Sequence, residues 1–313
     1  KIPRPLAHFF RQRFAQVTNP PIDSLREKLV MSLDVYLGPR RSLLEETPEH
    51  ARVLHLSSPV LRADELARLR ALNTPELRAT TLPAVFPVGE GPAGLRTAID
   101  RLRAQAEQAV RDGCTLLILS DRAIDTEHAP IPMPLAVGAV HHHLIDAGLR
   151  LRSSIICETG DVWDVHQAAV LIGYGASAIH PYLAFAASEG LAGGRGFEEV
   201  SATELADRYR KSLDTGLLKI MSKMGISTIA SYQGAQLFEI IGLSGDVVDA
   251  YFQGTPSRLG GLDLEGIAER ALQRHRLAFV ESPGKLQNYG MVRFRKDGEY
   301  HAFSPQNVRA LHQ

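Results

Sequence analysis

The feature that most constrains the fold is an alternation of short apolar runs with longer helical stretches. The short runs are rich in β-branched residues and are continuously apolar, as expected for strands of a parallel sheet that is covered on both faces. These runs lie at 53–56, 80–86, 115–119, 153–157, 178–179 and 227–229. The helical stretches between them are expected at 63–69, 95–112, 135–147, 162–172, 202–224 and 235–241.

Repeated strand–helix alternation predicts right-handed βαβ crossovers and therefore an α/β fold. The number of candidate strands is close to that of a (β/α)₈ barrel, although a doubly wound open sheet would give the same pattern. We favour a TIM-barrel-like (β/α) domain.

The two ends of the chain show other patterns. Near the start, helices are expected at 6–16, which ends before Asn19-Pro20-Pro21, and at 25–33. Near the end, the stretches 289–294 and 301–303 flank an Asp-Gly pair at Asp297, which predicts a β-hairpin.

Charge and composition exclude several classes of protein. Lys+Arg and Asp+Glu both total 35, so no global field would attract nucleic acid or an anionic membrane. No apolar run approaches the roughly 18 residues of a membrane span, and the first residues lack a secretory signal. Cys114 and Cys157 lie in apolar runs, which suits buried thiols in a reducing compartment. We therefore expect a soluble cytoplasmic protein that binds neither nucleic acid nor membrane.

Polar residues follow most of the expected strands, at the edge where barrel enzymes carry their chemistry. One interpretation is a catalytic mouth in which Asp121 or Glu158 is the general base and His180 the acid. The other is that these side chains satisfy loop backbone groups and cap the next helices. No spacing rule ties the residues together, so we favour the second interpretation. The set is Ser57-Ser58, Asp121-Arg122, Glu158-Thr159, His180-Pro181 and Ser231-Tyr232-Gln233.

Two further motifs have competing interpretations. The run His141-His142-His143 could suggest a metal site, but adjacent helical residues point about 100° apart, so structural or surface histidines are favoured. The glycine-rich run Gly254–Gly261 could form a phosphate cradle with Arg258, although a tight packing turn is favoured.

Six segments together resemble the central domain of the glutamate synthase large subunit, and the resemblance spans nearly the whole chain. The two most specific are RFAQVTNPPID at 13–23 and LLKIMSKMGIST at 217–228. The others are SYQGAQ at 231–236, YFQGTPSRLGG at 251–261, AVGAVHHHL at 136–144 and LIGYGA at 171–176.

The resemblance implies a function that this chain shares with other domains. The family enzyme converts glutamine and 2-oxoglutarate into two glutamates, with electrons from NADPH, NADH or ferredoxin. Its central domain would share the topology of FMN-linked oxidoreductase barrels without holding flavin, and would connect the glutaminase and FMN sites, between which ammonia travels in a tunnel. The full-length enzyme would carry FMN and an iron–sulfur cluster. The implied partners are the amidotransferase and FMN domains of the same polypeptide and a small NAD(P)H-oxidising subunit.

The resemblance also implies how the chain is divided. Residues 1–280 would form the central domain, truncated at its N-terminus, and residues 281–313 would begin the FMN-binding synthase domain. The family's glutaminase uses an N-terminal cysteine, whereas residue 1 here is Lys1, and its cluster needs three cysteines, whereas this chain has two. We therefore expect a fragment of an oxidoreductase with no catalytic, cofactor-binding or metal-binding residue of its own.

One candidate site remains within the segment at 13–23. Thr18 and Asn19 are expected to face a domain boundary and to line the ammonia path, where a hydroxyl and an amide can hydrogen-bond NH₃; a turn-capping pair is the competing interpretation. The alternative function for the whole chain is an independent FMN-dependent β/α-barrel oxidoreductase that uses Gly254–Gly261 for the FMN phosphate.

Overall fold

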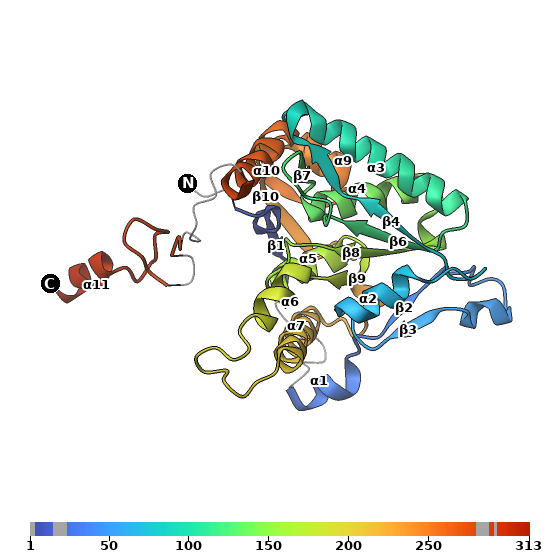
Figure 1. Cartoon of the computed structure of the whole chain (residues 1–313), viewed down its shortest axis with the longest axis horizontal. Helices are drawn as coiled ribbons and strands as arrows, with labels where there is room; N and C mark the ends of the chain where they lie inside the picture. The colour runs from blue at the N-terminus through green and yellow to red at the C-terminus, as the bar shows by residue number, and fades with distance from the viewer. Residues whose placement is uncertain (1–3, 15–23, 280–287, 291–292) are drawn as a thin grey trace.

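The centre of the molecule is a four-stranded parallel sheet. The computed structural model describes residues 4–14, 24–279, 288–290 and 293–313. The sheet has the order β4-β6-β8-β9 and crosses the middle of the molecule (Figure 1). Every residue of β6, β8 and β9 is buried, which confirms the prediction of a sheet covered on both faces. The strands are β4 (Ala79–Pro83), β6 (Leu116–Ser120), β8 (Ser154–Glu158) and β9 (Ala176–His180).

Three helices connect these strands in βαβ units, namely α3 (Ala93–Arg111), α4 (Met133–Asp146) and α5 (Val165–Gly173). They pack on β4, β8 and β9 respectively, and α4 contacts both α3 and α5. This arrangement confirms the α/β class and the barrel-like parallel core. Val60 extends the sheet through a parallel bridge to Ile179, beyond β9. The strands of the described part of the chain form open arcs rather than a closed ring.

A second sheet corrects two of the predicted helices. It joins β1 (Phe10–Gln12), antiparallel, to β10 (Phe238–Leu243), which pairs in parallel with β11 (Ser257–Leu262). The helix expected at 6–16 is therefore wrong, because only a 3₁₀ turn, η1 (Leu6–Phe9), precedes β1. The helix expected at 235–241 is wrong because most of that stretch belongs to β10.

The physical reason for both errors is a long-range aromatic cluster around Phe10. Its fully buried ring lies 5.1 Å from Tyr174, 6.3 Å from Phe238 and 5.0 Å from Phe252, measured between ring centroids. Edge-to-face packing of this kind, together with strand pairing, outweighs a local helical period.

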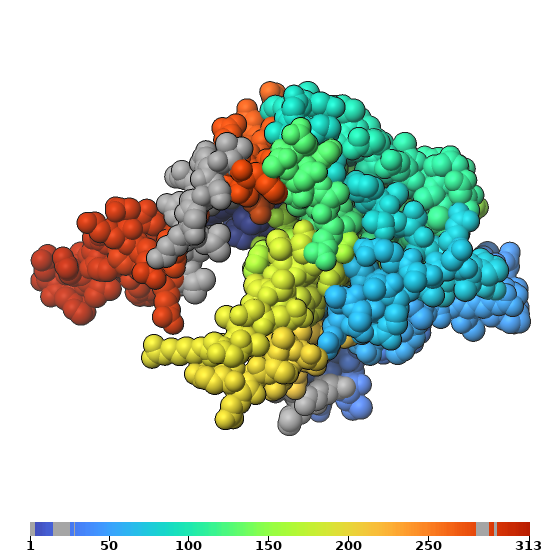
Figure 2. All heavy atoms as spheres, in the orientation of Figure 1, coloured from blue at the N-terminus to red at the C-terminus, as the bar shows by residue number. Residues whose placement is uncertain are grey.

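Two further predictions differ from the structure. The strand expected at 227–229 contributes only an isolated parallel bridge between Thr228 and Ser32, and α8 (Ile229–Tyr232) begins there, so Ser231-Tyr232-Gln233 does not follow a strand. In the C-terminal part, a turn forms at Asp297, but no strand flanks it among the residues that the structure describes. Figure 2 shows this C-terminal part projecting from the body of the molecule.

The other elements surround these two sheets, and no helix among the described residues is long and apolar enough to cross a membrane. They are α1 (Ser24–Val30), β2 (Val35–Leu37), η2 (Pro48–Ala51), β3 (Leu54–Leu56), α2 (Ala63–Arg70), β5 (Val85–Pro87), η3 (Val88–Glu90), β7 (His128–Pro130), η4 (Arg150–Arg152), α6 (Tyr182–Glu189), α7 (Ala202–Met224), α9 (Gly245–Tyr251), α10 (Leu264–Phe279) and α11 (Pro305–His312).

Replacing the central aromatic ring tests the packing of the second sheet. We predict that Phe10→Ala lowers the free energy of unfolding by about 3–5 kcal/mol, because it removes a buried ring and leaves a cavity. The matched control is Phe303→Ala, where the ring is 84% exposed. That change should cost less than about 0.5 kcal/mol. Urea unfolding followed by circular dichroism measures both, and equal losses would contradict the packing described.

Candidate functional site

The register of the parallel strands brings polar residues together at the carboxyl edge of the sheet. Ser120 lies beside Glu158, and Glu158 lies beside His180. Asp121 follows directly, and its backbone N–H donates to the Glu158 carbonyl at 3.1 Å. The structure therefore brings together Asp121, Glu158 and His180, which the sequence placed at strand ends.

The Glu158 carboxylate is buried, and its charge is compensated by two arginines. One oxygen accepts the Ser120 hydroxyl at 2.5 Å and Nη2 of Arg70 at 2.7 Å. Nε of Arg122 lies 3.5 Å from the other oxygen. A buried carboxylate held in this way ties β8 to β6 and α2, and each of its oxygens faces an arginine of the chain.

Asp121 is a buried acid poised near neutral pH. Its carboxylate accepts the Thr159 hydroxyl at 2.6 Å and the Gly160 N–H at 3.1 Å. Burial raises the pKa of Asp121 to about 6, although these hydrogen bonds oppose the rise. The group can hold or release a proton near physiological pH, and its hydrogen-bond partners lie in the loop after β8 and, at Tyr182, in α6 (Tyr182–Glu189).

His180 is held as a neutral ring. Its Nδ1 lies 2.9 Å from the Leu61 carbonyl, to which it donates, and its ring stacks on Phe185. Burial lowers the pKa of His180, so the imidazole carries no charge at neutral pH. This geometry supports the interpretation that the strand-end side chains satisfy loop backbone groups.

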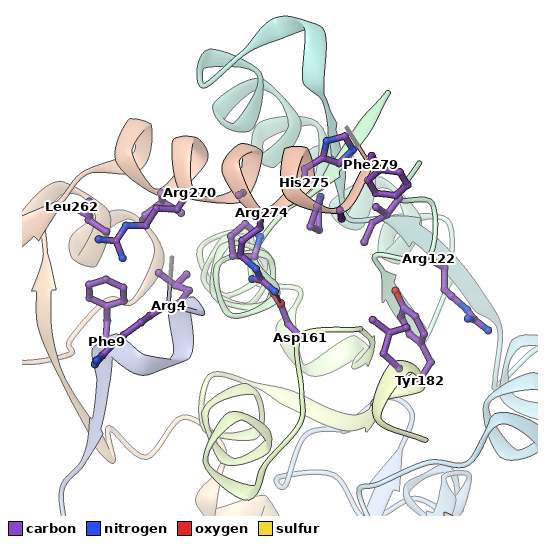
Figure 3. A pocket seen from close by; sticks show the side chains of 18 residues that line it. Arg4, Phe9, Arg122, Asp161, Tyr182, Leu262, Arg270, Arg274, His275 and Phe279 are labelled. Carbon is purple, nitrogen blue, oxygen red and sulfur yellow. Dashed lines mark hydrogen bonds and ion pairs between the residues drawn. The ribbon is translucent and has the colours of Figure 1, made fainter. Parts of the chain in front are cut away.

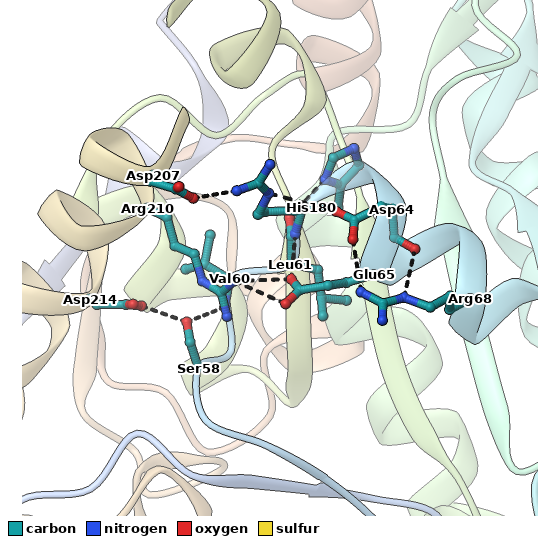
Figure 4. A network of polar contacts seen from close by, with 11 residues as sticks. Ser58, Val60, Leu61, Asp64, Glu65, Arg68, His180, Asp207, Arg210 and Asp214 are labelled. Carbon is teal, nitrogen blue, oxygen red and sulfur yellow. Dashed lines mark hydrogen bonds and ion pairs between the residues drawn. The ribbon is translucent and has the colours of Figure 1, made fainter. Parts of the chain in front are cut away.

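Ser58 is another of the predicted strand-end residues, and its side chain takes part in a polar network between α2 and α7 (Figure 4). Its hydroxyl donates to Asp214 at 2.6 Å and accepts the Val60 N–H at 3.0 Å. Nearby, Nη1 of Arg210 lies 3.0 Å from Glu65, which itself accepts a backbone N–H at the start of α2. These contacts fasten both helices to the carboxyl edge of the sheet.

A cavity of about 460 Å³ opens beside the strand ends, between α10, α6 and η1 (Figure 3). Its lining combines apolar side chains with four arginines, Arg4, Arg122, Arg270 and Arg274. Arg274 reaches from α10 to Asp161 at 3.0 Å, and the Arg270 guanidinium lies 5.5 Å from the centre of the Phe9 ring. Arg4 pairs with Glu299 at 2.9 Å. The described basic groups around this cavity therefore largely contact other parts of the chain.

Sequence reasoning did not find the residues that complete these sites. Arg70 lies on α2, 88 positions from its partner Glu158, and no local pattern links them. The helix α10, which carries Arg270 and Arg274, was not predicted. Its signal was present, because Leu264, Ile267, Ala268 and Ala271 are buried at helical spacing.

The cysteines of the described chain do not fit an iron–sulfur cluster. Cys157 lies inside β8, and burial raises the pKa of its thiol, whereas cluster ligands are thiolates. Cys114 is also buried, and its sulfur lies 3.4 Å from Nε of Arg78. The described residues include no group of three His, Cys, Asp or Glu placed to hold a metal ion.

The glycine-rich run does not fit a phosphate cradle. From Ser257 onward it forms β11, and a Cβ on Gly261 would lie 2.2 Å from the Gly242 carbonyl of β10. The Thr255 hydroxyl is engaged with the Tyr174 hydroxyl at 2.8 Å. Close packing against β10 explains Gly261, and Gly254 lies in a turn with a φ of 75°, whereas a Cβ on Gly260 would meet nothing within 4 Å. The tight packing turn that the sequence favoured therefore covers Gly254, while Ser257–Gly261 belongs to a strand.

The three consecutive histidines of α4 differ in their hydrogen-bond partners, although the rings of His141 and His142 lie 5.1 Å apart, edge to face. Nδ1 of His141 accepts Nε of Arg150 at 2.8 Å, whereas His143 pairs with Glu107 at 2.7 Å. Nε2 of His142 is buried and has no hydrogen-bond partner among the described residues. Thr18 and Asn19, the predicted ammonia-path residues, lie outside the residues that the structure describes.

Comparison with known proteins identifies the family. The model of the glutamate synthase central domain matches residues 1–244. The chain belongs to the glutamate synthase central domain family. It is 45% identical over 99% of its length to ferredoxin-dependent glutamate synthase 2 of Synechocystis, and 46% identical over 99% to the chloroplastic ferredoxin-dependent glutamate synthase of spinach. It is 44% identical over 98% to the glutamate synthase [NADPH] large chain of Bacillus subtilis. The chain spans about one fifth (20–21%) of the length of these relatives.

The raised pKa of Asp121 predicts a pH dependence of stability. The folded central domain holds this proton more tightly than the unfolded chain, so stability is highest below the ordinary value of 3.8 and falls as the pH rises to about 6. The free energy of unfolding of the wild type, minus that of Asp121→Asn, should therefore decrease by about 3 kcal/mol across this window.

Asp125→Asn is the matched control, because hydrogen bonding to His128 lowers the pKa of the exposed Asp125. Its difference from the wild type should change little above the ordinary value of 3.8, because the contribution of a lowered pKa is lost only as the pH falls below that value. Urea unfolding from pH 4 to pH 7 measures both differences, and a pH-independent difference for Asp121→Asn would contradict the buried, protonatable carboxyl.

Proposed function

We propose that this domain is a non-catalytic scaffold of glutamate synthase, the enzyme that converts glutamine, 2-oxoglutarate and reductant into two glutamates. The domain would link the glutaminase and FMN sites and help to form the ammonia path. One observation carries the proposal: at the carboxyl edge of the sheet, Asp121, Glu158 and His180 all have partners within the chain. Groups so engaged hold loops in place rather than meet a substrate.

The proposal assigns the cofactors and partners to the rest of the polypeptide. FMN and an iron–sulfur cluster would be bound outside residues 1–280, and residues 281–313 would begin the FMN-binding domain. The partners would be the amidotransferase and FMN domains and, in NAD(P)H-dependent enzymes, a small electron-donating subunit. The buried cysteines and the strand-forming glycine run support this assignment, because neither fits a cofactor.

The ammonia path is proposed to pass the segment that contains Thr18 and Asn19. This segment joins β1 of the second sheet to α1, and α1 is followed by the bridge between Ser32 and Thr228. It thus connects the β1-β10-β11 sheet with the part of the chain between α7 and α8. The hydroxyl of Thr18 and the amide of Asn19 could hydrogen-bond a small polar molecule such as NH₃.

Enlarging Thr18 in the full-length enzyme tests this role. We predict that Thr18→Phe lowers the yield of glutamate per glutamine hydrolysed several-fold, because the bulky ring would obstruct the path. Synthesis from added ammonium should stay unchanged, because it does not use the path. Both yields are measured by amino-acid analysis of timed reactions.

The matched control is Thr47→Phe, at the exposed residue that precedes η2. It should keep the wild-type ratio of the two yields. Unchanged coupling in Thr18→Phe would remove Thr18 from the ammonia path.

A further inference from the structure

A second cavity lies at the opposite, amino edge of the parallel sheet. Its volume is about 510 Å³, and its lining includes Ser154, the first residue of β8, and Arg150 of η4. This size suits a small organic molecule. Nothing in the proposed scaffold role uses this cavity.

Arg150 carries a charge that no carboxylate of the described chain balances. Its Nε donates to Nδ1 of His141 at 2.8 Å, and its two terminal nitrogens donate to the carbonyls of Ser153 and Gly175, each at 2.7 Å. All three acceptors are neutral. Two are backbone carbonyls, and the His141 ring is uncharged because burial lowers its pKa to about 3. Burial and the neighbouring Arg40 lower the pKa of Arg150 itself to about 10, so it stays charged at neutral pH. A largely buried cation without an anion is costly.

A second, independent observation is an unpartnered hydroxyl in the same lining. The Ser153 side chain is 3% exposed, and its Oγ has no hydrogen-bond partner among the described residues. A buried hydroxyl of this kind costs free energy unless another group meets it. Ser153 and Arg150 both line the cavity, so an anion bound there would lie beside both residues.

The remaining lining fits an anion with an apolar portion. Arg40 is exposed, contacts Gln233 at 3.3 Å, and is held beside η4 by its backbone N–H, which donates to the Leu151 carbonyl. Ile145 and Leu151 supply exposed apolar surface. No acidic residue of the described chain lines the cavity.

We propose that this cavity binds a small organic anion through its carboxylate or phosphate group. Arg150 and Arg40 supply the positive charge, the Ser153 hydroxyl donates the hydrogen bond that it otherwise lacks, and Ile145 and Leu151 contact the apolar part of the ligand. Guanidinium groups bind carboxylates and phosphates alike, so the ligand could carry either.

The test is a titration of the whole chain with inorganic phosphate and, separately, with succinate, at constant ionic strength set by sodium chloride. We expect saturable NMR shifts of the Arg150 Nε–H and the His141 ring, and a higher thermal midpoint, with at least one of the two anions. Binding of phosphate alone or succinate alone would assign the ligand class. Equal shifts with chloride, or no saturable shift with either anion, would overturn the proposal.

Two conservative variants locate the site without removing the structural bonds of Arg150. Ser153→Ala and Arg40→Gln should each weaken binding roughly tenfold, because each removes a hydrogen bond or a charge that would meet the anion. Arg152→Gln is the matched control, because Arg152 lies on the same 3₁₀ turn but lines a different cavity. Unchanged affinity in both Ser153→Ala and Arg40→Gln would place any bound anion elsewhere and overturn the proposal.

Discussion

The structure depends on the pairing of β6, β8 and β9 in one parallel register. This register buries every side chain of the three strands and places Ser120, Glu158 and His180 along one edge. It equally places the residues that precede the strands along the opposite edge. The central positions of β6 and β8 are apolar, and those of β9 include one buried hydroxyl, Ser177, so the polar side chains of these three strands lie mainly at the two edges.

The buried charges at the two edges of the sheet have different kinds of partner. At the carboxyl edge, buried Glu158 meets the guanidinium of Arg70, and Ser120 completes its hydrogen bonding. At the amino edge, Arg150 meets only neutral acceptors, and Ser153 has an unpartnered hydroxyl. The engaged side chains of the carboxyl edge hold helices α2 and α7 in place, whereas the incompletely engaged amino edge is suited to bind something else.

How much could be predicted depended on the range of the interactions. The elements β6, β8, α3 and α4 were predicted because their apolar patterns are long and local. The helices predicted around Phe10 and Phe238 were wrong because these two segments pair with each other as strands. No local sequence pattern encodes that long-range contact. Among the residues that the structure describes, the Asp-Gly turn at Asp297 has no flanking strand, since a two-stranded hairpin has little stability of its own.

The candidate site followed the same division. Asp121, Glu158 and His180 could be placed together, because carboxyl ends of parallel strands meet at one edge. Their partners could not, since Arg70 and the Leu61 carbonyl reach them from distant parts of the chain. Whether strand-end groups are free to react or already engaged is therefore a property of tertiary structure, not of strand position.

The most direct measurement asks whether the purified, folded 313-residue chain retains flavin or hydrolyses glutamine. After cooperative unfolding has shown that the chain is folded, its flavin absorbance and its hydrolysis of glutamine are measured in the presence of added FMN. We predict neither retained flavin nor glutamine turnover, because the proposed scaffold role places the reacting groups of glutamate synthesis in other domains. Stoichiometric FMN bound to the chain, or glutamine hydrolysed by it, would contradict the scaffold role.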